Sequence, residues 1–144
     1  MKTDQSDIYI DLCNLHKILY RAQFTMTKGD RIIMGNRLLD LNQNCVSITS
    51  RAINAPTKSE RLEHIDQLNG EFDALRLNLQ ACADLHLFKD SRSTVDRLNQ
   101  PSQNVSRTVL SIFEVVGKID EQIGRWRNKT RRDLPRDSGR QTDI

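Results

Sequence analysis

The chain has 144 residues, of which 37% are hydrophobic and 28% are charged, and its formal net charge is +3. This length suits one domain with a buried core, so a second domain is not required. The small numbers of glycine, proline and aromatic residues disfavour a β-sandwich or a disordered chain and favour long helices. No stretch approaches the roughly 20 apolar residues that span a bilayer, and the polar start MKTDQSD is not a signal peptide. We therefore expect a cytoplasmic protein that makes no membrane contact.

The first two helices are predicted over residues 8–25 and 30–54, because apolar residues recur there at steps of three and four and so share one helix face. The first stripe comprises Ile8, Leu12, Leu15, Leu19 and Ala22. The second comprises Met34, Leu38, Leu41, Cys45, Ile48 and Ala52, with a flanking row of Leu39, Val46 and Ile53. Pro56 ends the second helix because proline cannot continue the hydrogen-bond ladder.

The last two helices are predicted over residues 58–88 and 101–128. Thr57 and Glu60 have the spacing of a capping box at the start of the third helix, and Pro101 suits the first turn of the fourth. The third stripe comprises Leu62, Ile65, Leu68, Phe72, Leu75, Leu79 and Cys82. The fourth comprises Val105, Val109, Ile112, Val116, Ile119, Ile123 and Trp126. Together the four patterns predict an all-α, antiparallel up-down-up-down bundle over residues 1–130, followed by a flexible basic tail over residues 131–144.

The segment FTMTKGDRIIMGNR, which joins the first two helices, contains Gly29 and Gly35. A phosphate-binding P-loop needs GxxxxGK[ST] between a strand and a helix, and this segment has neither the spacing nor the strand. We interpret Gly29 as a left-handed residue that ends the first helix and Asp30 as the cap of the second. Gly35 falls inside the second helix, where it costs about 1 kcal/mol relative to Ala, and a close approach by another helix would explain it.

Catalytic and metal-binding patterns are missing from the sequence. His16, His64 and His86 fall on three different helices, and no CxxC, HxxxH or ExxH pair occurs, although di-iron bundles depend on such pairs. The three cysteines (Cys13, Cys45 and Cys82) lie in or beside apolar stripes, as reduced core thiols do. We therefore expect a protein that is not an enzyme and holds no metal or cofactor.

Positive charge is concentrated at the C-terminus, where residues 125–144 hold seven Lys or Arg and three Asp. Cations in the segment GRWRNKTRR can stabilise the end of a helix, and they can also neutralise the phosphates of RNA or DNA. Trp126 continues the apolar stripe and is expected to pack in the core rather than to stack on a base. The predicted nucleic-acid-binding residues are Arg125, Arg127, Lys129, Arg131, Arg132, Arg76, Lys28 and Arg31. Arg37 and Arg51 are interpreted as ordinary solvated charge.

Three segments carry a resemblance to a known family. FTMTKGDRIIMGNRLLDL, FDALRLNLQACADLHLF and IFEVVGKIDEQIGRWRNK are similar to the first helix junction, the third helix and the closing helix of the small "four helix bundle protein" family. That family includes the ribosomal-RNA intervening-sequence proteins and Avd, the accessory variability determinant of diversity-generating retroelements. The likeness covers roughly residues 8–130 and contains no catalytic signature.

The resemblance to Avd implies a homopentameric barrel that binds the retroelement's reverse transcriptase, together with template RNA or cDNA, in support of mutagenic reverse transcription. Two departures matter: the retroelement proteins are usually more basic than this chain, and only Arg76 matches the arginines of their third helix, since Gln80 follows one turn later. The alternative is a protein-interaction bundle of the intervening-sequence type that binds no nucleic acid directly.

A homo-oligomer is also predicted from the residues themselves. One bundle core does not need both apolar rows of the second helix, so the flanking row and a close-packed glycine are candidates for contacts between subunits. The predicted oligomer-packing residues are Gly35, Leu39, Val46 and Ile53.

Overall fold

A computed structural model of the chain describes residues 3–89 and 107–134. Its helical elements are α1 (Thr3–Gln23), α2 (Lys28–Asp30), the π-helical turn η1 (Arg31–Gly35), α3 (Asn36–Ile53), α4 (Lys58–Asp84) and α6 (Arg107–Arg132). The α2, η1 and α3 elements follow one another without a break and form one long helical run. The described residues contain no strand, so the prediction of an all-helical fold is confirmed for this part of the chain.

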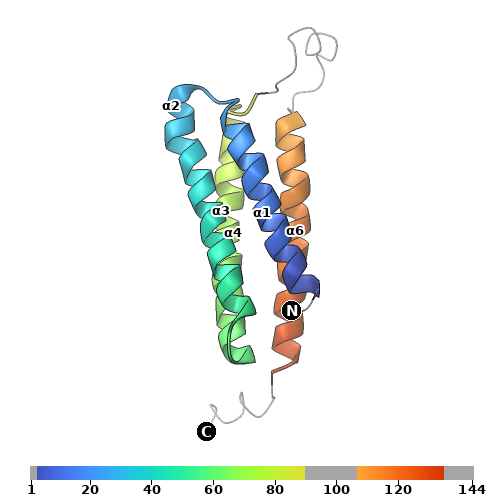
Figure 1. Ribbon diagram of the computed structural model, residues 1–144. Coiled ribbons are helices and arrows are strands. Elements are labelled where there is room, and N and C mark those ends of the chain that lie inside the picture. Colours follow the sequence, from blue (N-terminus) through green and yellow to red (C-terminus); the bar gives the residue numbers. More distant parts are fainter. Residues whose placement is uncertain (1–2, 90–106, 135–144) are drawn as a thin grey trace.

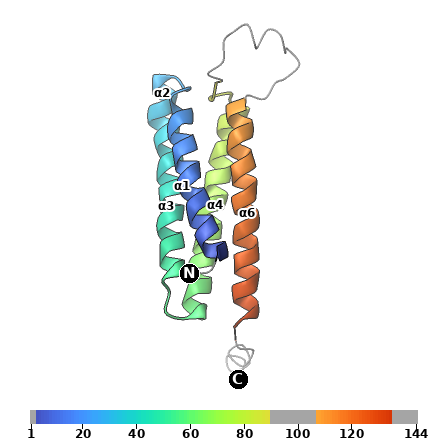
Figure 2. The ribbon, with the colours of Figure 1, turned by 45° about the vertical axis from the view of Figure 1, so that its right-hand side comes forward.

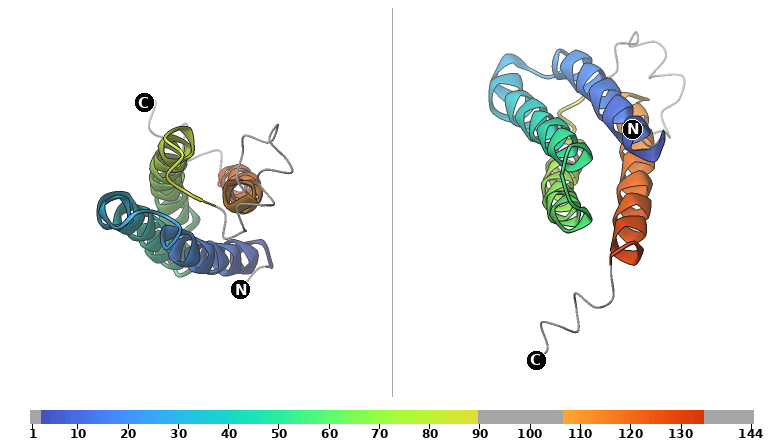
Figure 3. Two further views of the ribbon diagram at one scale, coloured as in Figure 1. Left: turned by 90° about the horizontal axis from the view of Figure 1, so that it is seen from above. Right: turned by 60° about the horizontal axis from the view of Figure 1, so that its bottom comes forward.

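The long helices lie side by side as a bundle (Figures 1 and 2). Seen from above, α1 and α4 occupy opposite corners, and each packs against both α3 and α6 (Figure 3). The colours of Figure 1 show that α1 and α4 run in one direction and that α3 and α6 run in the other. The α3–α4 connection and the end of α6 therefore lie at one end of the bundle, and α2 and the end of α4 lie at the other.

The core is built from the predicted stripes. All the stripe residues of α1 are buried, as are those of α6 from Val109 to Trp126, and those of α4 except the half-buried Leu62. On α3 the stripe residues Leu38, Cys45, Ile48 and Ala52 are buried, and Met34 and Leu41 pack against them. The predicted start of the fourth helix at residue 101 and its stripe residue Val105 lie outside the described residues.

The junction between the first two helices differs from the prediction. Thr27, and not Asp30, is the N-cap: its Oγ1 accepts a hydrogen bond from the Asp30 N–H at 3.3 Å and donates one to the Asp30 carboxylate at 3.0 Å. Gly29 is not left-handed, since no glycine in the described part has a positive φ. The Thr25 N–H and hydroxyl instead bond to the Ala22 carbonyl as α1 ends at Gln23. These bonds from Thr25 satisfy a carbonyl at the C-terminal end of α1 without a left-handed glycine.

The two ends of α4 follow different rules. At its start Thr57 Oγ1 accepts a hydrogen bond from the Glu60 N–H at 3.1 Å, which confirms Thr57 as the N-cap and one of the two bonds of the predicted capping box. At its end the helix stops at Asp84, four residues earlier than predicted, because His86 adopts a φ of 55° and the Leu87 N–H reaches back to the Cys82 carbonyl. This is the geometry of a Schellman motif, in which glycine is the usual left-handed residue.

Candidate nucleic-acid interface

The last turns of α6 place a buried face next to a charged one. Trp126 and Thr130 are buried, so Trp126 packs in the core as its stripe predicts, while Arg125, Arg131 and Arg132 are exposed. The helix continues to Arg132, although the sequence pattern predicts a flexible tail from residue 131. Arg131 and Arg132 therefore belong to a helix, and the remaining basic residues of the predicted tail, Arg136 and Arg140, lie outside the described residues.

Three cations of this segment have no carboxylate partner among the described residues. Within the part of the chain that the structure describes, no ion pair is formed by Lys129, Arg131 or Arg132. Positive charge in the last turn stabilises the helix end, but these side chains still keep their charge available to an anion from outside.

The other two cations of the segment are engaged. Arg127 Nε lies 2.7 Å from Asp66 Oδ1 on α4, although its N–H is not aligned with that oxygen, so the contact is an ion pair without a well-formed hydrogen bond. Arg125 lies 3.9 Å from Glu121 one turn earlier, and both side chains are largely exposed. An exposed pair of this kind contributes little and is easily exchanged for a phosphate.

The α3–α4 connection adds positive charge that the sequence analysis missed. Arg51 is exposed and forms no ion pair with a described residue. Lys58 Nζ lies 3.9 Å from the Asp133 carboxylate, and Arg61 Nε donates to the Ala52 carbonyl at the end of α3.

We call Arg51, Lys58, Arg61, Lys129, Arg131 and Arg132 the basic end. Glu60, Glu63, Asp66 and Asp133 lie at the same end, so its excess of positive charge is modest. The expected topology could have revealed this grouping of positive charge, because in an up-down-up-down bundle the second connection lies at the same end as the C-terminus of the last helix.

Lys28 and Arg31 lie at the opposite end of the bundle, on α2 and η1 (Figure 1). The Arg31 guanidinium stacks 5.3 Å above the centre of the Phe24 ring, and Phe24 meets Tyr20 edge to face. A helix of the length of α4, with 27 residues, spans about 40 Å, so these two residues cannot share one compact site with the basic end.

Arg76 lies midway along α4 and binds two carboxylates. Its Nη1 is 2.9 Å from Asp120 Oδ1 on α6 and 3.2 Å from Asp73 Oδ1 on its own helix. Two acidic partners compensate its charge and would repel a phosphate. The structure therefore brings together the C-terminal members of the predicted set and leaves Arg76, Lys28 and Arg31 apart from them.

The predicted oligomer-packing residues have partners within the chain. A Cβ at Gly35 would lie 3.1 Å from Gln23 Cβ and 3.2 Å from Gln23 Oε1, so the close approach comes from the end of α1. Leu39, Val46 and Ile53 are half-buried against the core. A role for these residues between subunits stays a prediction.

Nucleophilic and metal chemistry find no support among the described residues. Burial raises the pKa of the Cys45 thiol to about 12 and that of Cys82 to about 11, with nearby Glu71 and Asp30 adding to the respective effects. Thiols of this kind stay protonated and unreactive at neutral pH. The described histidines, cysteines and acidic residues form no group able to hold a metal ion, and among the described helices none is both long and apolar enough to cross a membrane.

Comparisons of the chain with protein-family models, curated proteins and solved structures found no match.

Proposed function

We propose that the protein is a non-catalytic, nucleic-acid-binding accessory protein that contacts phosphates through its basic end. The observation that carries this proposal is the group of cations without ion-pair partners in the described chain, Lys129, Arg131 and Arg132, at the same end as Arg51. Cations that are not already neutralised can release counterions from RNA or DNA, which supplies most of the affinity of sequence-independent binding.

The biological setting rests on the resemblance of the helix junction, the third helix and the closing helix to Avd. This resemblance implies a diversity-generating retroelement as the context, the reverse transcriptase as the protein partner, and template RNA or cDNA as the nucleic acid. It also gives a homopentamer, which light scattering on the full chain would test. A reverse-transcriptase gene beside a pair of near-identical repeats in the same genome would support this setting.

The test of nucleic-acid binding is a salt titration with single-stranded RNA and DNA, using the full chain and a variant with Lys129, Arg131 and Arg132 changed to Ala. We expect weaker binding, and a slope of log affinity against log salt that is smaller by about one for each phosphate that the variant no longer neutralises. The three side chains form no ion pairs with described residues, so the variant should fold normally.

The matched control changes Lys28, Arg31 and Arg21, which lies in the last turn of α1, to Ala, and so removes the same charge at the opposite end of the bundle. If the basic end is the interface, this control keeps most of the salt slope of the unchanged protein. Equal losses in both triple variants would show that net charge alone is responsible, and an unchanged affinity in the basic-end variant would remove this end from the mechanism.

A further inference from the structure

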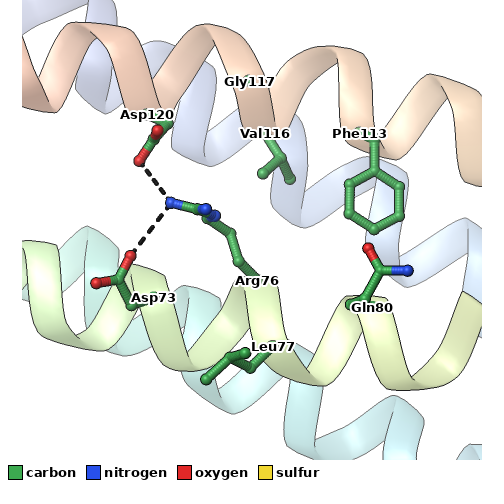
Figure 4. A pocket seen from close by; sticks show the side chains of 8 residues that line it. All are labelled: Asp73, Arg76, Leu77, Gln80, Phe113, Val116, Gly117 and Asp120. Carbon is green, nitrogen blue, oxygen red and sulfur yellow. Dashed lines mark hydrogen bonds and ion pairs between the residues drawn. The ribbon is translucent and has the colours of Figure 1, made fainter.

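A groove of about 650 Å³ separates α4 from α6 on the surface of the bundle (Figure 4). One part of the groove is apolar. It is lined by Leu77 of α4, which is 72% exposed, and by Phe113 and Val116 of α6. Leu110 is also exposed and lies two turns before Gly117, so it extends the same face of α6. Single exposed leucines are common, but apolar side chains that adjoin one another along a groove are typical of surfaces at which proteins make contacts.

The other part of the groove is charged. Arg76 bridges Asp73 and Asp120, and its Nη1 contacts one oxygen of each (Figure 4). The three side chains remain between 43% and 53% exposed. Two carboxylates around one guanidinium leave an excess negative charge, and the second oxygen of each carboxylate has capacity for a further donor.

Gly117 lies between these two parts, in the middle of α6. A glycine inside a helix costs about 1 kcal/mol relative to alanine. At Gly35 the close contact with Gln23 explains that cost, but a Cβ at Gly117 would have no described atom within 4 Å. Gly29, Gly70 and Gly124 are equally open, but among these glycines only Gly117 lines this groove, where its missing side chain leaves room for a partner to lie close to α6.

We propose that this groove binds an amphipathic helix of a partner protein, with apolar side chains against Leu77 and Phe113 and a Lys or Arg at the carboxylate oxygens of Asp73 and Asp120 that Arg76 does not contact. Charge complementarity selects this occupant. The bound cation would complete an alternating cluster of two carboxylates and two basic groups. On α6, Asp120 and Phe113 are seven positions apart, about 10 Å along the helix axis, and on α4 Asp73 and Leu77 are four positions apart, about 6 Å. The basic residue and the apolar residues of the partner should therefore be one to two helical turns apart.

Nucleic acid fits this surface poorly, because the excess charge has the sign of a phosphate and the guanidinium of Arg76 is already paired. The proposal is therefore independent of phosphate binding at the basic end. Loss of one activity need not change the other.

The experiment is a selection from a displayed library of helix-forming peptides, with the full chain as bait. We expect enriched peptides to share apolar residues at helical spacing and a Lys or Arg one to two turns away. Binding of an enriched peptide, labelled and measured by fluorescence anisotropy, should weaken about tenfold with Gly117→Leu, since a side chain would then fill the groove. Changing Asp73 and Asp120 together to Asn should weaken it less, and should reduce its sensitivity to salt.

Gly70→Leu is the matched control. Gly70 is also an open glycine inside a long helix, with no described atom within 4 Å of its Cβ position, but it lines a different surface between α3 and α4. Both substitutions raise helix propensity, so each variant should melt no earlier than the unchanged protein, and only Gly117→Leu should lose the peptide. The proposal is overturned if acidic peptides are enriched, if no peptide is enriched, or if both glycine variants bind equally. It is also overturned if Gly117→Leu, but not Gly70→Leu, lowers the oligomer mass measured by light scattering, because a second copy of the chain would then occupy the groove.

Discussion

The two ends of the bundle both contain basic residues, but these residues differ in what they already contact. At the α2 end, Arg31 stacks on Phe24, Asp30 exchanges two hydrogen bonds with Thr27, and Gln23 fills the space beside Gly35. At the basic end, Arg51, Lys129, Arg131 and Arg132 form no ion pairs with described residues. Lys28 and Arg31 likewise form no ion pair with a described residue, so what distinguishes the basic end is the larger number of such cations that lie together there.

The largest expected effect concerns the anchor beneath the basic end. Trp126 is buried, so Trp126→Ala should lower the free energy of unfolding by about 3 to 5 kcal/mol. The indole N–H has no hydrogen-bond partner among described atoms, and Trp126→Phe should therefore cost much less, about 1 kcal/mol. Urea unfolding of both variants measures the difference, and similar losses would mean that the indole N–H makes a bond of its own.

The second effect belongs to the α2 end. Gly35→Leu would force a side chain against Gln23, and we expect a loss of about 1 to 3 kcal/mol. Gly29→Ala, in the same helical run but in open space, should instead stabilise the protein by up to about 1 kcal/mol. Thermal melts of the two variants should move in opposite directions. A tolerated leucine at position 35 would show that the α2 end is not tightly packed.

The two threonine caps provide a direct comparison of the ends. Thr57 caps α4 at the basic end and Thr27 caps α2 at the other, each by accepting a hydrogen bond from the N–H three residues later. Thr57→Ala and Thr27→Ala should each cost about 1 kcal/mol. Chemical denaturation tests this, with Thr57→Ser as a variant that should keep most of the cap.

The smallest expected effect is a gain in stability at the C-terminal end of α4, which lies at the α2 end of the bundle. His86 has a left-handed backbone that disfavours any residue except glycine, so His86→Gly should stabilise the protein by about 0.5 to 1 kcal/mol. Ala83→Gly, within the regular helix, should destabilise it by about 1 kcal/mol. Differential scanning calorimetry separates the two, and a loss of stability in His86→Gly would mean that the imidazole makes a contact that outweighs the backbone cost.

Residues that depend on helical spacing could be predicted from the sequence. The stripes from Ile8 to Trp126 are buried or half-buried in the described chain, because a period of three and four residues leaves little choice of face. The cap at Thr57 could be predicted for a similar reason, since its hydroxyl and the Glu60 N–H are only three residues apart.

Features that depend on how helices sit against one another could not be predicted in this way. Arg76 and Asp120 are 44 positions apart, and no local pattern pairs them. The α4–α6 groove and the contact between Gln23 and Gly35 likewise depend on the rotation of each helix about its own axis. Spacing defines the apolar face of a helix, but it does not say which charged residue on the flank meets which partner.

The π-helical turn has a consequence for how this chain can vary in length. Across η1 the Asn36 N–H bonds to the Arg31 carbonyl, five residues back rather than four, so this turn holds one residue more than an α-helical turn would. Removing one residue between Arg31 and Gly35 could restore α-helical bonding without changing the register of Leu38 and the rest of α3 in the core. The α2 end is therefore the place in the long helix where the protein can lose a single residue while the remainder of the bundle keeps its packing.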